Sequence, residues 1–156
     1  MSKTKLQLPS EQAIPVNGFP LGVQYYGSPH TNKEDWQRDF PLIKEHGLDT
    51  IAVWAIWGHL EPSPNQYDFS AWDLIFDTAQ LHDLMVMPVT TIEIQPYWIH
   101  RQFPEAYMVD QRGSPIVSTT GEYTGGISPG ACFDHGAPRE QAVKFLSSFA
   151  SHFKDR

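Results

Sequence analysis

The stretch LDTIAVWAIW, residues 48–57, decides the fold of this chain. Apolar residues occupy both odd and even positions within it, so a strand formed here would be buried on both faces. Strands of this kind are typical of parallel sheets, whose two faces are both covered. Two further runs, LGVQYY at 21–26 and LMVMPVTTI at 84–92, also predict strands. The sequence therefore predicts three strands of one parallel sheet.

A helix is predicted between the first two strands. Thr31 or Asn32 can cap its start, and Gly47 is a natural stop at its end. An interior proline costs a helix roughly 3 kcal/mol, so Pro41 predicts either a kink or a helix boundary at another position. Three residues spaced at i, i+4 and i+7 give this helix one apolar face: Trp36, Phe40 and Ile43.

Two more helices are predicted further along the chain. Ser70 and Asp73 form a variant of the capping box, which predicts a helix from Ser70 through about His82. Residues 93–137 then form a long irregular stretch, far beyond the usual connection of about 2–6 residues, and loops of that length tend to be functional. Pro138, in a first-turn position, opens the last helix. Its predicted apolar face consists of Ala142, Leu146, Phe149 and Phe153.

The alternation of strands and helices favours a parallel sheet with right-handed crossovers, either a small doubly wound sheet or the start of a (β/α)8 barrel. The first loop, YYGSPHTNKED, holds one glycine and so lacks the glycine-rich phosphate cradle of doubly wound domains. Three units cannot close a barrel that needs eight. We therefore predict the α/β class, with residues 21–156 as a partial (β/α)8 TIM barrel: about the first three βα units, with a long loop after strand 3. Residues 1–20 are predicted to form an extended leader.

Composition narrows the range of partners. The net charge of −7 would be repelled by nucleic acid and by an anionic membrane surface, so we expect neither as a partner. Aromatic residues reach 13%, and flat rings suit stacking on the C–H face of a sugar. The N-terminal residues lack a signal-peptide pattern and no apolar run reaches 18 residues, which predicts a soluble, cytoplasmic protein.

Several motifs occur in a fixed order along the chain. They are GVQYY, EDW-x-x-D, W-x-x-LEP, YDFS-x-W-D, FPE-x-x-x-VD-x-x-G and CF. In this order and spacing they resemble the N-terminal part of glycoside hydrolase family 42, and the similarity runs from about Leu21 to Arg156. The resemblance implies a β-galactosidase built on a TIM barrel, with a carbohydrate as its substrate and, in the full-length protein, possible assembly into a homo-oligomer.

The resemblance also implies retaining hydrolysis by two carboxyl groups about 5–5.5 Å apart. In the family, the acid/base is a Glu preceded by Asn at the end of the fourth strand, and the nucleophile is a Glu near the seventh. No Asn-Glu pair occurs in this sequence, which stops at Arg156 after the third predicted helix. We therefore expect no catalytic residue within the chain, which would be an N-terminal fragment of the enzyme and inactive by itself.

Four residues are candidates for substrate binding. Glu93 directly follows the third predicted strand and would accept hydrogen bonds from sugar hydroxyls, or be a solvated loop acid. Trp98 matches a Pro-x-x-Trp-like segment of the family and would form a wall of the sugar site, or pack in the core. Tyr25 and Tyr26 end the first strand, and since side chains alternate, one of them faces the barrel interior; Tyr25 is assigned to the substrate. Trp57 is expected at or near the sugar.

Two other residues, Glu61 and Cys132, have side chains that could take part in catalysis or metal binding. Glu61, in the LEP motif, would be either a catalytic carboxylate or a framework residue that bonds backbone groups of the turn, and the resemblance favours the framework. Cys132 matches a cysteine that binds zinc in some relatives, with His135 nearby. Tetrahedral zinc needs four ligands, so we predict a buried thiol there, no metal site and no cofactor.

The chain departs from the family pattern at two places. Trp54 occupies a strand position where family members often carry a sugar-holding Glu, and residues 128–131 replace an Arg and a His that precede the family's cysteine. The resemblance therefore does not imply the exact sugar.

An alternative interpretation is a non-catalytic carbohydrate-binding or interaction module derived from such a barrel. A module that stands alone would blunt its open strand edges with charge or proline. Residues 48–57 and 84–92 carry almost no charge, which favours a truncated enzyme. A third arrangement, in which separate chains supply the remaining units, would also cover these edges.

Overall fold

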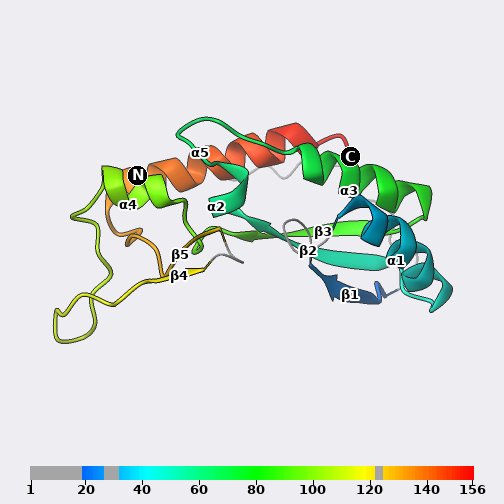
Figure 1. The fold of residues 1–156 in the computed structure, drawn as a ribbon, viewed down its shortest axis with the longest axis horizontal. Coiled ribbons are helices and arrows are strands. Elements are labelled where there is room, and N and C mark those ends of the chain that lie inside the picture. The colour runs from blue at the N-terminus through cyan, green and yellow to red at the C-terminus, as the bar shows by residue number, and fades with distance from the viewer. Residues whose placement is uncertain (1–18, 27–31, 122–124) are drawn as a thin grey trace, which may run out of the picture.

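The computed structural model describes residues 19–26, 32–121 and 125–156, so nearly all of the expected leader lies outside the described residues. Strands and helices alternate as the sequence predicts, with additional short elements after the second and third strands (Figure 1). The strands are β1 (Gly22–Tyr25), β2 (Thr50–Ile56), β3 (Met85–Thr91), β4 (Thr119–Gly121) and β5 (Gly126–Ser128). The helices are α1 (Lys33–Glu45), α2 (Trp57–Leu60), α3 (Ser70–Leu81), α4 (Tyr97–Gln102) and α5 (Gly136–Phe153).

The main sheet is parallel and has the order β1-β2-β3, which confirms the predicted α/β class. The central strand β2 is buried along one face, where Ile51, Val53 and Ala55 are 0% exposed. Helices α3 and α5 lie on this side of the sheet (Figure 1). The predicted burial of β2 is thus confirmed on this face, whereas Ala52 and Trp54 on the other face are only half-buried.

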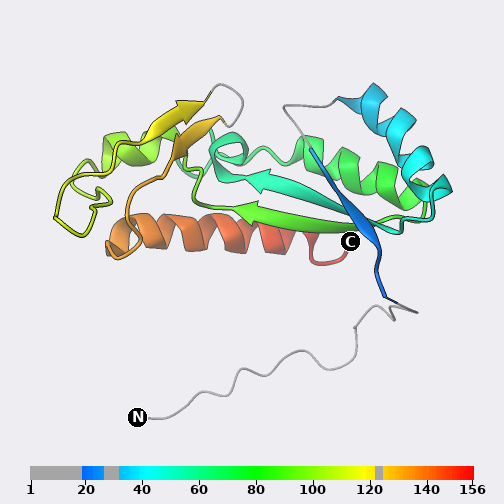
Figure 2. The same cartoon turned by 90° about the horizontal axis from the view of Figure 1, so that it is seen from below.

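The opposite face of the sheet is open among the described residues (Figure 2). On β3, the side chains of Met87 and Val89 are 53% and 37% exposed, so the prediction that this strand is buried on both faces is wrong for this structure. The physical reason is that no described helix or loop covers these two side chains, although Ile56 and Thr91 are buried nearer the carboxyl ends of the strands. We call this side of the sheet the open face.

Aromatic packing joins the last helix to the rest of the core. Phe149 meets Trp72 of α3 edge-on at 5.1 Å between ring centroids, and Phe145 stacks on Trp57 at 5.7 Å. The predicted apolar face of α5 is confirmed at Ala142, Phe149 and Phe153, but the fully buried residue of its middle turn is Phe145, and Leu146 is only half-buried. In the described part of the chain, none of the helices combines the length and apolarity needed to cross a membrane.

Two local predictions about helices change. The predicted capping box at Ser70 is wrong, because the N-cap residue is Phe69 and it makes no side-chain cap bond. Instead, the Asp68 carboxylate accepts hydrogen bonds from the backbone N–H of Ser70 at 3.0 Å and from its hydroxyl at 2.6 Å. Helix α1 runs through Pro41 without a break, and Asn32 caps it in a full capping box with Asp35.

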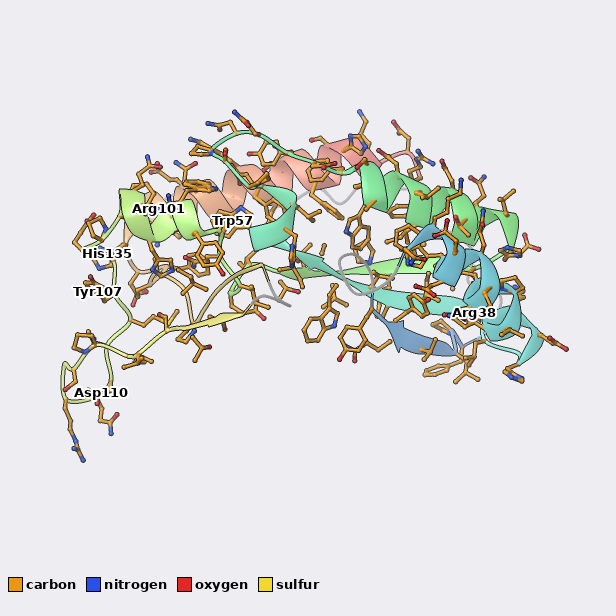
Figure 3. All side chains as sticks on the ribbon, viewed as in Figure 1. Arg38, Trp57, Arg101, Tyr107, Asp110 and His135 are labelled. Atoms are coloured by element: carbon orange, nitrogen blue, oxygen red, sulfur yellow. The ribbon has the colours of Figure 1, made fainter. Side chains whose placement is uncertain are left out.

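The stretch after β3 is more ordered than predicted. It contains α4 and the antiparallel pair β4–β5, whereas residues 93–137 were expected to be irregular. Within it, residues 107–117 form an arm that folds back on itself through a bridge between Val109 and Pro115. Tyr107 and Asp110, on this arm, lie far from the three-stranded sheet (Figure 3).

We predict that Phe145→Ala lowers the free energy of unfolding by about 3–5 kcal/mol, because it removes a fully buried ring that stacks on Trp57. Urea denaturation followed by circular dichroism measures the change. The matched control is Val143→Ala, on the same helix with its side chain 56% exposed, which should change stability by no more than about 0.5 kcal/mol. Equal losses in the two variants would contradict the assigned packing of α5.

Candidate functional site

The loops that follow β2 and β3 meet beyond the carboxyl ends of these strands. The backbone N–H of Gly58 donates to the carbonyl of Ile94 at 3.0 Å, and the indole N–H of Trp98 donates to the carbonyl of Glu61 at 2.9 Å. In parallel α/β sheets and barrels, ligands bind at this edge, outside the carboxyl ends of the strands. These two loops therefore frame the candidate site.

Glu61 is the buried anchor of the first loop, with a side chain only 1% exposed. Helix α2 places it four residues after Trp57, and its carboxylate accepts from the Trp57 indole N–H at 2.6 Å and from the backbone N–H of Asn65 at 2.8 Å. Burial raises the pKa of this carboxyl, and the two hydrogen bonds oppose the rise only in part. These contacts confirm the framework interpretation of Glu61.

The structure corrects the expectation for Trp57, whose ring is 0% exposed. Phe145 stacks on it at 5.7 Å between ring centroids, and Trp98 meets it edge-on at 6.3 Å. A ring enclosed in this way offers no face to a sugar. Trp57 is therefore a packing residue that connects the β2 loop with α4 and α5.

The expectation for Tyr25 is also corrected. Its hydroxyl donates to Asp39 at 2.7 Å and its ring meets Phe40 edge-on at 5.4 Å, so it faces α1 behind the sheet. Burial and the neighbouring Asp39 carboxylate raise the pKa of this phenol well above its ordinary value. Because side chains alternate, the next residue takes the other side, and Tyr26 lies 5.8 Å from Trp54, centroid to centroid.

Glu93 and Trp98 remain at the edge of the site. Glu93 is exposed and follows the last residue of β3, Thr91, by two positions, while Trp98 is half-buried on α4. Both belong to the loop after β3, so the structure keeps these two candidates together. It separates them from Tyr25, which lies on the helix side of the sheet.

Sequence reasoning missed Gln95, a fully buried polar residue. Its side-chain amide donates to the carbonyl of Ala131 at 3.0 Å and accepts from the Ala131 N–H at 2.7 Å. Its backbone also bonds Ile127 in both directions. A Cβ on Gly130 would lie 2.1 Å from the Gln95 side-chain carbon, so only glycine fits there. The glycines at positions 126 and 130 were the available signal for this close approach.

Cys132 lies directly after this contact and is half-buried, with its backbone N–H bonded to the carbonyl of Ala106 at 2.8 Å. Among the described residues, no group of three or more His, Cys, Asp or Glu side chains is placed to hold a metal ion.

The fold and the site define the class of the protein: an α/β chain with a parallel sheet, whose candidate site lies beyond the carboxyl ends of the strands. The chain belongs to glycoside hydrolase family 42, because the model of that family, described as beta-galactosidase, matches residues 25–156.

Known relatives bear the same description. Beta-galactosidase BgaA of Clostridium cellulovorans is 29% identical over 94 residues, which cover 60% of this chain and 14% of that protein. A beta-galactosidase of Thermus thermophilus is 28% identical over 134 residues, or 85% of this chain and 20% of that protein. The chain thus spans a fifth or less of the length of these relatives.

Solved structures share the fold. The beta-galactosidase from the psychrophilic Marinomonas ef1 matches with a TM-score of 0.75 at 21% identity, covering 88% of this chain and 20% of that one. The polyextremophilic beta-galactosidase from Halorubrum lacusprofundi matches with a TM-score of 0.74 at 23% identity, with the same coverage. The described strands and helices therefore match the N-terminal region of the β-galactosidase TIM barrel.

We predict that Glu61→Gln destabilises the fold by about 1–3 kcal/mol at acidic pH. The amide of the glutamine keeps one oxygen that can accept a hydrogen bond, but its NH2 group cannot accept one. Either the Trp57 indole N–H or the Asn65 backbone N–H therefore loses its acceptor. Chemical denaturation measures the loss, and Glu105→Gln, at an exposed position, serves as the matched control. A loss no larger than that of the control would contradict the anchoring role.

The same pair of proteins tests the pKa of Glu61. Because burial raises this pKa in the folded state, proton binding favours folding, and the contribution is lost as the pH rises through the folded pKa. The stability of the wild type should therefore fall relative to that of Glu61→Gln as the pH rises above about 4, the ordinary pKa of a glutamate. A difference that instead grows with pH would show that the two hydrogen bonds outweigh burial.

We predict that Gly130→Ala destabilises the protein by about 1–3 kcal/mol, because the added methyl group overlaps the buried Gln95 side chain. Gly136→Ala is the matched control, since a Cβ there meets nothing within 4 Å, and it should leave stability unchanged or raise it by up to about 1 kcal/mol. Thermal unfolding compares the two variants. If both behave alike, the Gln95 contact does not constrain the loop.

Proposed function

We propose that this chain is the N-terminal part of a retaining glycoside hydrolase that cleaves terminal β-galactosides or related β-glycosides. The observation that carries the proposal is the family match over residues 25–156, joined to a parallel sheet of the expected strand order. The catalytic acid/base and nucleophile are expected beyond residue 156, as the resemblance implies.

The open face and the free edge of β3 support a barrel that continues. Met87 and Val89 expose apolar surface that a lone domain would normally cover. A hollow of about 740 Å³ runs along β3 and includes Phe76 and Pro88 in its lining. This is the kind of space that a further strand and helix fill, so we propose that residues 21–156 supply about the first three βα units of a (β/α)8 barrel.

Within this part of the barrel, Glu93 and Trp98 are proposed to contact the sugar. The exposed carboxylate of Glu93 would accept hydrogen bonds from hydroxyl groups, and the half-buried ring of Trp98 would form a wall. Glu61 would act indirectly, because its carbonyl holds the Trp98 indole and its carboxylate is enclosed. Trp57 and Tyr25 are left out of this set for the reasons given above.

In the retaining mechanism that the resemblance implies, none of the described residues is expected to carry a reacting atom. One carboxylic acid protonates the departing glycosidic oxygen, and a carboxylate about 5–5.5 Å away attacks the sugar carbon to form a covalent intermediate that water hydrolyses. This chain would help to orient the substrate for that attack and to exclude water from the site.

Turnover of an aryl β-galactoside tests the proposal. The pure 156-residue chain should show none, whereas the protein encoded by the reading frame extended past Arg156 should hydrolyse it. Glu93→Gln in the extended protein should raise KM by about tenfold, the effect of losing a charge-assisted hydrogen bond to substrate. Val143→Ala, on the outer face of α5, is the matched control.

Turnover by the 156-residue chain itself would contradict the expected position of the catalytic pair. An extended protein that binds sugars without turnover would favour the alternative, a non-catalytic carbohydrate-binding module.

A further inference from the structure

Three side chains form a row across the open face. The register pairs Tyr25 with Val53, so the next residues along the chain, Tyr26 and Trp54, also lie level with each other. Trp54 is in turn paired with Val89. The rings of Tyr26 and Trp54 are 5.8 Å apart, with an angle of 56° between their planes. Two aromatic rings therefore stand side by side at a slant, near the ends of β1 and β2.

The row is accessible and rigidly supported. Tyr26 is 52% exposed, Val89 is 37% exposed, and Trp54 is half-buried. On the reverse side of β2, Val53 and Ala55 are fully buried in the core, which fixes the strand that holds Trp54. The rings thus combine access from the open face with a backbone that cannot easily shift.

The neighbouring row leaves room beside the rings. It consists of Gln24, Ala52 and Met87, which the register places level with one another. Ala52 has only a methyl group as its side chain, so β2 itself does not fill the space next to Trp54. Gln24, with an exposed amide, precedes Tyr26 by two residues and lies on the same face of the sheet. An apolar wall with one polar amide at its margin suits a ligand that has both C–H and O–H groups.

We propose that Tyr26 and Trp54 form an aromatic platform that stacks against the C–H face of a pyranose and helps to select the sugar. The inference rests on the proposed function and deepens it. The axial O4 of β-galactose leaves C3–H, C4–H and C5–H on one face, whereas glucose divides its axial C–H groups between both faces. The platform therefore favours galactosides over glucosides.

Saturation-transfer NMR on the 156-residue protein tests this with methyl β-D-galactopyranoside as the probe. Transfer should be strongest to H3, H4 and H5, and weaker overall for methyl β-D-glucopyranoside. Trp54→Leu should raise Kd at least about tenfold, whereas Trp54→Phe, which keeps a ring, should stay within about threefold. Tyr107→Leu, which removes a 56% exposed ring on the distant arm, should leave Kd unchanged.

Thermal unfolding of each variant separates loss of binding from loss of fold, and Trp54→Phe is the variant that retains packing. The platform is overturned if Trp54→Leu binds as tightly as the wild type, or if the wild type shows no saturation transfer. The proposed function is judged separately, by turnover in the extended protein. If Trp54→Leu changes neither turnover nor KM in the extended protein, the platform is contradicted, whereas the proposed glycosidase function is not.

Discussion

The structure depends on one buried carboxylate, that of Glu61. It accepts from the indole of Trp57 and the backbone of Asn65, while its own carbonyl accepts from the indole of Trp98. One residue therefore joins α2, the turn that follows it and the loop after β3. Through Trp57, which stacks on Phe145, the same contact extends to α5. An acidic residue is kept in the core because each of its oxygens is hydrogen-bonded to a fixed donor.

The sequence predicts the frame of this fold well and its site poorly. The three strands and three long helices follow from periodicity, and β2 could be placed because its apolar run fits a buried parallel strand. Trp57 and Tyr25 were expected at the sugar, but the direction of a side chain depends on tertiary packing that a motif does not encode. Gln95 was missed because a buried amide has no signature apart from the glycines that approach it.

The family membership accords with the proposal that this chain is part of a barrel. The chain spans a fifth or less of its relatives, and its described part leaves one sheet face open and two strand edges free. The same open face carries Tyr26 and Trp54. The tryptophans thus divide into those that build the frame, such as Trp57 and Trp72, and those that are proposed to face the substrate, Trp54 and Trp98.

Hydrogen exchange at the indole N–H groups of the five tryptophans tests this division most directly. The Trp57 proton, enclosed and bonded to Glu61, should exchange far more slowly than that of Trp54 on the open face. Fast exchange at Trp57 together with protection at Trp54 would reverse the two roles and contradict the account.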